Sequence, residues 1–244
     1  MIRSLIMAIA ALFIITACGG NTEFVEPANQ SFEDDSPTDE NVEDPQIEVE
    51  KLSFITMDWD GAHREAPLWN VYLYLALSST NKDLINKRPN DVLDFCPRYD
   101  DLGDEQRKMF WIHLISVMAR FESNFDPNTA YEEDFVDSKG KKVVSRGLLQ
   151  ISDESSRGYG CNQRLAEELH ESQKNLVCGL KIMSHWVNAD KVISELKNNK
   201  WRGGARYWAV LRTYSGRDLV KQVKERTRQS EVCREQDQIF TKFE

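Results

Sequence analysis

Apolar residues recur at steps of three and four along several stretches of this chain, which is the spacing of an amphipathic α-helix. The clearest stretch covers residues 104–121, which contain no proline or glycine and begin with two acidic residues, as helix starts prefer. Similar spacing predicts helices over 68–77, 176–187 and 207–211. We therefore expect a mainly α fold.

One stretch of the chain breaks the helical spacing. Residues 134–144 contain an Asp-Ser-Lys-Gly sequence, which is typical of a turn, followed by two lysines and two valines. This pattern predicts a turn or a small β-hairpin on the surface. No internal repeat is visible in the sequence.

The first 18 residues are typical of an export signal. A single basic residue, Arg3, precedes an apolar run that spans only about 20 Å as a helix, too short to cross a membrane. The run ends in Ile-Thr-Ala-Cys, which resembles a bacterial lipobox, so we expect Cys18 to be acylated and to anchor the protein to a membrane. The residue after it is glycine and not aspartate, which favours the outer membrane. The alternative is a plain secretory signal with a chance cysteine.

Residues 19–50 are predicted to form a disordered tether to a single domain at 51–244. The part from 21 to 50 holds eleven acidic residues and no basic one, and large apolar residues are few. Although the chain as a whole carries a net charge of -9, residues 51–244 hold 30 basic and 29 acidic residues. The domain therefore lacks the basic excess of a nucleic-acid-binding protein. A hydrophobic content of 41% excludes collagen-like, fully disordered and multi-span membrane proteins.

Four cysteines besides Cys18 lie in the domain, an even number that suits disulfides in an exported protein. Three pairings are possible, and four buried thiols are the alternative. We favour Cys161–Cys178 with Cys96–Cys233, the second of which would tie the start of the domain to its tail. There is no CxxC or HExxH spacing and the four histidines are scattered, so we expect no metal and no cofactor.

The strongest candidate for chemistry is Glu122. It lies between two phenylalanines at the end of the helix predicted over 104–121. Burial against apolar neighbours raises the pKa of a carboxyl group, which makes it a usable proton donor near neutral pH. The simpler reading is a solvated acid at a helix end.

Further segments of the sequence favour the reading of Glu122 as a proton donor. The sequence resembles the soluble-type (SLT) lytic transglycosylases, which share a fold with goose-type lysozyme. Their pattern runs Glu-Ser-x-x-x-Pro, Gly-Leu-Met-Gln, an Asn and Gly pair, and a Tyr after a helix, all in order within residues 104–216. The matching positions are Glu122, Ser123, Pro127, Gly147, Leu148, Leu149, Gln150, Asn175, Gly179 and Tyr214. Leu149 replaces the usual Met, Ser215 replaces the usual Asn, and the gap between Glu122 and Gln150 is longer than usual.

The resemblance implies a lysozyme-like helical domain with a small β-hairpin insertion near the active site, and it implies an activity on peptidoglycan. Glu122 would protonate the oxygen that bridges N-acetylmuramic acid and N-acetylglucosamine. It would then accept a proton from the C6 hydroxyl of the muramic acid as a 1,6-anhydro ring closes. Ser123 and Gln150 would hold the acetamido group, and the backbone of Gly147 and Leu148 would line the cleft. Tyr214 would orient Glu122 or bind the sugar.

No second carboxylate is required by this mechanism. The sequence offers six acids, none in an apolar setting like that of Glu122: Asp126, Glu132, Glu133, Asp134, Asp153 and Glu154. Arginines are candidates for pairing with substrate carboxylates: Arg146, Arg206, Arg212 and Arg217. Three aromatic residues are candidates for stacking on sugar rings, with a core role as the alternative for the last: Trp201, Tyr207 and Trp208.

Three alternatives remain open on the sequence. In a lysozyme of the same fold, water would attack the sugar, and a water-activating carboxylate or a deacetylated substrate would favour that outcome. A non-catalytic peptidoglycan-binding lipoprotein would use a degenerate site, and an envelope scaffold would mainly bind other proteins. The presence of Glu122, Gln150 and Tyr214 favours an enzyme.

Overall fold

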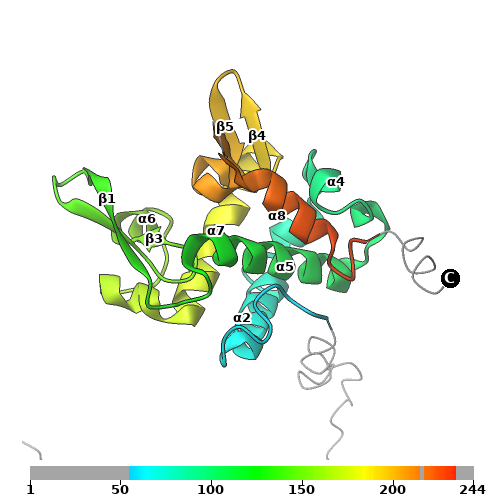
Figure 1. The fold of residues 1–244 in the computed structure, drawn as a ribbon, viewed down its shortest axis with the longest axis horizontal. Helices are drawn as coiled ribbons and strands as arrows, with labels where there is room; N and C mark the ends of the chain where they lie inside the picture. Colours follow the sequence, from blue (N-terminus) through cyan, green and yellow to red (C-terminus); the bar gives the residue numbers. More distant parts are fainter. Residues whose placement is uncertain (1–54, 215–216, 235–244) are drawn as a thin grey trace, which may run out of the picture. The chain divides into compact units, whose positions relative to one another are not determined.

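Two long helices, α5 (Asp104–Ser123) and α7 (Ser172–Asp190), organise the computed structural model, which describes residues 55–214 and 217–234 (Figure 1). Every residue of α5 from Met109 to Ala119 is buried, because other elements surround this helix. Helix α2 (Ala66–Ser78) packs against both long helices, and α8 (Leu219–Arg228) packs against α5. The helices predicted over 68–77, 104–121 and 176–187 are thus confirmed.

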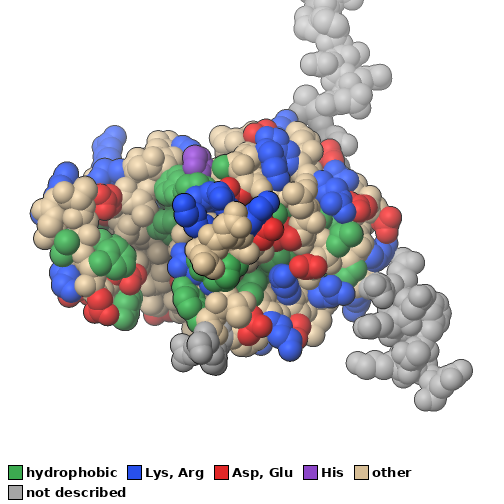
Figure 2. All heavy atoms as spheres, turned by 90° about the horizontal axis from the view of Figure 1, so that it is seen from above, with side chains coloured by type: hydrophobic (Ala, Val, Ile, Leu, Met, Phe, Trp, Pro, Cys, Tyr) green, Lys and Arg blue, Asp and Glu red, His purple; other side chains and the backbone are tan. Residues whose placement is uncertain are grey.

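Short elements connect α2 to α5 and complete the helical core. They are α3 (Lys82–Asn86), α4 (Val92–Phe95) and the 3-10 turn η1 (Tyr99–Asp101). Within the described residues, no helix is long and apolar enough to cross a membrane. On the face shown in Figure 2, basic and acidic side chains are interspersed, as expected for a domain with nearly equal numbers of both.

The strands form three small antiparallel sheets. The largest has the order β1-β2-β3 and confirms the predicted hairpin, which begins four residues earlier than expected. Its strands and those of the two hairpins are β1 (Ala130–Val136), β2 (Lys142–Arg146), β3 (Ile151–Ser152), β4 (Ser194–Lys197), β5 (Lys200–Gly203), β6 (Thr213–Tyr214) and β7 (Arg217–Asp218). The elements α6 (Asp153–Gly158) and η2 (Ala166–His170) lead from β3 to α7. The described part is therefore mainly α with a few short strands.

The helix predicted over 207–211 is wrong. The chain instead forms the β4–β5 hairpin, followed by two 3-10 turns, η3 (Gly204–Arg206) and η4 (Ala209–Leu211). Trp208 has an extended backbone, with a φ of -93° and a ψ of 126°, so an α-helix cannot run through residues 207–211. The three-residue spacing of apolar side chains that suggested an α-helix also fits 3-10 turns.

Both predicted disulfides are confirmed. Cys96–Cys233 joins residues 137 positions apart in the sequence, and Cys161–Cys178 joins residues 17 apart. Disulfides of this kind are typical of oxidising, exported compartments. The predicted signal ending at Cys18 and the predicted tether at 19–50 lie outside the described residues.

Candidate active site

Glu122 lies in the last turn of α5 and is half-buried. The pKa of Glu122 is raised from 4.5 to about 8, chiefly because burial desolvates the carboxyl group and secondly because of the negative charge of Glu133. The guanidinium of Arg212 and a hydrogen bond from the backbone of Val210 act against this rise. The carboxyl group therefore holds its proton at neutral pH.

Glu133 provides a second carboxylate near Glu122. It lies on β1, where it is half-buried, and its Oε1 accepts a hydrogen bond of 2.7 Å from the hydroxyl of Ser145 on β2. In the sequence Glu133 is one of six acids without an apolar setting like that of Glu122, and no local pattern distinguishes it from the other five.

Arg212 lies near Glu122 and also binds Tyr214. Arg212 donates to the Tyr214 hydroxyl at 3.0 Å, and its other donors bind the carbonyl oxygens of Ala205 and Arg206 at 2.6 and 2.8 Å. The Tyr214 ring is 46% exposed, so it is accessible to a ligand. The predicted site residue thus lies in the expected region, at the edge of β6 and not at the end of a helix.

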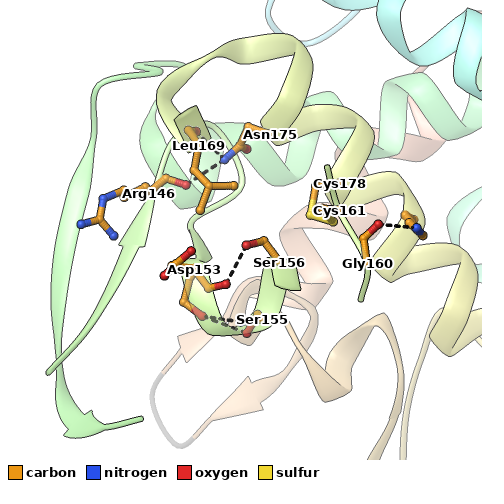
Figure 3. The surroundings of a disulfide bond; sticks show 11 residues. Arg146, Asp153, Ser155, Ser156, Gly160, Cys161, Leu169, Asn175 and Cys178 are labelled. Carbon is orange, nitrogen blue, oxygen red and sulfur yellow. Dashed lines mark hydrogen bonds between the residues drawn. A yellow bond between two sulfur atoms is a disulfide. The ribbon is translucent and has the colours of Figure 1, made fainter. Parts of the chain in front are cut away.

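The turn formed by residues 147–150 is built around the buried side chain of Asn175. Its Nδ2 donates to the carbonyl oxygens of Arg146 and Leu169, both at 2.9 Å (Figure 3). Its Oδ1 accepts from the backbone of Leu149 at 2.8 Å. Gly147, with a φ of 73°, has no Cβ, and a Cβ there would lie 2.4 Å from Asn175 Nδ2. Only glycine therefore allows the turn to approach α7 this closely.

Gly179 allows the same approach one turn further along α7. A Cβ at this position would lie 2.2 Å from the Cδ1 of Leu149. Leu148 and Leu149 are both fully buried, so their side chains anchor the turn in the core. The Asn and Gly pair singled out in the sequence thus has a structural role in holding this turn.

Ser123 and Gln150 connect the turn to the end of α5. The buried Ser123 hydroxyl lies 3.0 Å from the carbonyl oxygen of Leu148, so it is engaged by the backbone. The Nε2 of Gln150 donates to the carbonyl oxygens of Thr129 and Gly147 at 3.2 and 2.9 Å. No partner is seen for its Oε1 within the described residues, so this oxygen remains available as an acceptor.

The backbone beside Glu122 is strained. Asn124 and Phe125 have φ values of 52° and 67°, and Gln150 has a φ of 47°. Non-glycine residues with such values cost of order 1–3 kcal/mol each and tend to occur at functional sites. The Phe125 ring is buried and lies 4.8 Å from the guanidinium of Arg120, contacts that fix the turn after α5.

The arginine and aromatic candidates divide into different roles. Arg206 is engaged by Asp190 at 2.6 Å, and Arg146 donates to the backbone of Val144. Trp208 is 2% exposed and donates to the carbonyl oxygen of Leu149, so it belongs to the core. Trp201 and Tyr207 are half-buried. In the part of the chain that the structure describes, no cluster of side chains suits a metal ion.

Comparisons with known proteins give one group of relatives. Neither the protein-family models nor the curated proteins include a match. Among solved structures, wild-type Bd0314 DslA matches with 38% sequence identity and a TM-score of 0.70, over 74% of this chain and 98% of that one. This chain belongs to the DslA family. Two variants of Bd0314 DslA match with the same identity and TM-score, over 73–74% of this chain and 97–98% of theirs. Each of these DslA variants carries one Glu→Gln substitution, at glutamates eleven positions apart.

Proposed function

We propose that this member of the DslA family is a peptidoglycan-cleaving glycosidase with a lysozyme-like fold. Its target is the β-1,4 bond between N-acetylmuramic acid and N-acetylglucosamine, and Glu122 is the general acid. The observation that carries this proposal is a carboxyl group whose pKa is raised to about 8 beside a second carboxylate. Two carboxyl groups with environments of this kind are the usual equipment of glycosidases.

The DslA relatives support the choice of residues. The two glutamates replaced in the DslA variants are eleven positions apart, which is also the separation of Glu122 and Glu133 in this chain. We infer that these two pairs correspond. Replacing a carboxylate by its amide keeps the shape and removes the proton-transfer function, which is the substitution chosen to test an acid or a base.

Glu133 favours hydrolysis as the outcome of the reaction. Protonated Glu122 donates its proton to the bridging oxygen, the bond from that oxygen to C1 of the muramic acid breaks, and positive charge develops at C1. Glu133 accepts a proton from a water molecule whose oxygen then bonds to C1. This is the lysozyme reaction, and it gives a product with a free reducing end.

The lytic transglycosylase reaction is the second candidate. In that reaction Glu122 acts first as acid and then as base toward the C6 hydroxyl, and the substrate's own acetamido group stabilises C1. The unpaired Oε1 of Gln150 favours this outcome, because it offers an acceptor for the N–H of an acetamido group. The carboxylate of Glu133 has no assigned part in it.

We propose that the reaction takes place outside the cytoplasm. The two disulfides support export, and lipidation of Cys18 would hold the domain on a membrane, with the outer membrane favoured by the sequence that follows. A non-catalytic peptidoglycan-binding lipoprotein would keep the same location without the chemistry.

Mass spectrometry of fragments released from purified peptidoglycan tests the proposal. We expect the wild-type protein to release fragments with reducing ends, and Glu122→Gln to lower the rate by about 10²–10⁴-fold. Glu133→Gln is expected to cause a similar loss, while Glu132→Gln, at an exposed neighbouring position, serves as the matched control. Fragments ending in 1,6-anhydromuramic acid would establish transglycosylation instead, and full activity of Glu122→Gln would contradict both candidates.

A further inference from the structure

A second candidate site lies on the other side of α7. A cavity of about 400 Å³, within the size range of small-ligand pockets, is lined on this helix by Val177 and Lys181. Because successive residues of an α-helix are 100° apart, Val177 and Lys181 point roughly opposite to Asn175 and Gly179, which hold the turn beside Glu122. The cavity is therefore separate from the candidate active site.

An unpaired amide group lines this cavity. Both polar atoms of the Gln163 side chain, Nε2 and Oε1, are buried, and neither has a hydrogen-bond partner within residues 55–214 and 217–234. Leaving buried polar atoms unpaired is costly, so native proteins rarely do so without a reason. A ligand that carries both an N–H and a C=O group, such as a peptide bond, would satisfy both atoms once the Gln163 side chain turns toward the cavity.

A positive charge lies on the same wall. The ammonium group of Lys181 donates to the carbonyl oxygen of Gly160 at 2.7 Å, and no carboxylate of the described residues pairs with it. By contrast Lys174, also at the cavity, forms ion pairs with Glu168 and Glu171 at 2.6 and 3.0 Å. The uncompensated charge of Lys181 thus favours a ligand with a carboxylate.

Apolar groups also line the cavity. The Cys161–Cys178 disulfide, next to Gly160 in Figure 3, and the side chain of Val177 border the cavity. They offer contact to a small apolar side chain. An amide group, a free carboxylate and a small apolar side chain together describe the C-terminal end of a short peptide.

We propose that this cavity binds the C-terminal end of a short peptide with small side chains, with Gln163 on its last amide bond and Lys181 on its carboxylate. Peptidoglycan carries short stem peptides that end in alanine, so the identity of the natural ligand rests on the proposed function. The recognition chemistry of the cavity does not. Binding there holds the enzyme on strands that carry free peptide ends while Glu122 acts on the glycan.

Calorimetric titration of the full chain with acetyl-lysyl-D-alanyl-D-alanine tests this proposal. We expect binding that weakens roughly tenfold when the peptide carboxylate is capped as an amide. Lys181→Met is expected to weaken binding of the free acid by a similar factor and to leave binding of the capped peptide unchanged. Lys221→Met, at an exposed position on α8, is the matched control and is expected to have no effect.

Gln163→Leu separates a binding role from a structural one. This variant removes the unpaired atoms but keeps the approximate volume, so we expect an unchanged or higher melting temperature together with roughly tenfold weaker binding of both peptides. Absence of peptide binding by the wild type, or binding that neither variant changes, would overturn the proposal. Binding of N-acetylglucosamine in place of the peptide, with the same dependence on Gln163, would also overturn it.

Peptide binding at this cavity and glycan cleavage at Glu122 can be tested separately. Cleavage of glycan strands stripped of their peptides by Gln163→Leu is expected to equal that of the wild type. If no protein cleaves glycan but the peptide still binds with the stated dependence on Lys181, the proposed function falls and the peptide site stands. If cleavage is normal and no peptide binds, only the second site is excluded.

Discussion

The two longest helices of the described part carry a carboxyl group at their C-terminal ends, and the two groups differ in protonation. On α5, Glu122 is desolvated near Glu133, and its pKa is raised to about 8. On α7, Asp190 accepts hydrogen bonds from Arg206 at 2.6 Å and from the backbone of Gly203 at 2.8 Å, and its pKa is lowered to about 2. One helix therefore ends in a neutral acid and the other in an ion pair.

Desolvation of Glu122 and the supply of positive partners to Asp190 account for this difference in pKa. The C-terminal end of a helix disfavours negative charge, so an ionised carboxylate there needs compensation. Asp190 receives it from two guanidinium groups, those of Arg202 and Arg206. Near Glu122 the donors of Arg212 bind two backbone carbonyls and a tyrosine hydroxyl instead. The end of α7 is thus built for stability, and the end of α5 keeps a proton available at a cost to stability.

Among the variants that test this comparison, Glu122→Gln is expected to change the free energy of unfolding most. The folded-state pKa of Glu122 is raised, so its penalty is absent below about pH 4.5, grows as pH rises, and is complete above about pH 8. The neutral amide avoids it, and we expect the variant to be more stable than wild type by about 2–4 kcal/mol at pH 8 and by almost nothing at pH 4. Denaturant unfolding at both pH values measures this. A difference that does not grow with pH would show that Glu122 is not held neutral.

Asp190→Asn is expected to act in the opposite direction. A lowered pKa gives stability that is present above about pH 4 and is lost as pH falls through about 2. We expect the variant to be less stable by about 2 kcal/mol at pH 7, with the difference shrinking at pH 2.5, in the same unfolding experiment. Asp100→Asn, which breaks an exposed pair with Arg88, is the control and should change stability little. An equal loss of stability in both variants would show that the Asp190 ion pairs contribute no more than the exposed pair of Asp100 and Arg88.

The smallest expected effect concerns the pKa of Glu122 itself. Glu133→Gln removes the neighbouring negative charge, so the pKa of Glu122 should fall below about 8 but stay well above 4.5, because desolvation is the larger cause. An NMR titration of the Glu122 side-chain carboxyl carbon measures the change. Glu132→Gln should leave that titration where it is. A pKa that does not move would place Glu133 too far away to share the site.

Local patterns in the sequence were sufficient for much of the fold. The spacing of apolar residues predicted α2, α5 and α7, since these helices bury faces with the expected period. The turn sequence at 137–140 predicted the hairpin, and the position of Glu122 between aromatic residues indicated a raised pKa. These features depend on neighbours in the sequence, which a single sequence displays.

One local turn signal and several features that depend on distant segments were missed. The β4–β5 hairpin turns at Asn198 and Asn199, both with positive φ, which is a recognisable two-residue turn signal that was overlooked. The approach of Glu133 to Glu122 depends on how the hairpin folds over the end of α5, and the isolation of Gln163 depends on packing around α7. Neither is encoded in any local spacing of residues.

The Cys96–Cys233 bond has a consequence for how the protein withstands proteases. It joins the segment before α5 to the segment after α8, so it encloses both long helices and all seven strands of the described part in one covalent loop. A single cut anywhere inside that loop leaves the two pieces attached to each other. Such a nicked molecule keeps its apparent mass on a gel until a reductant is added, and its halves stay together for as long as the surroundings remain oxidising.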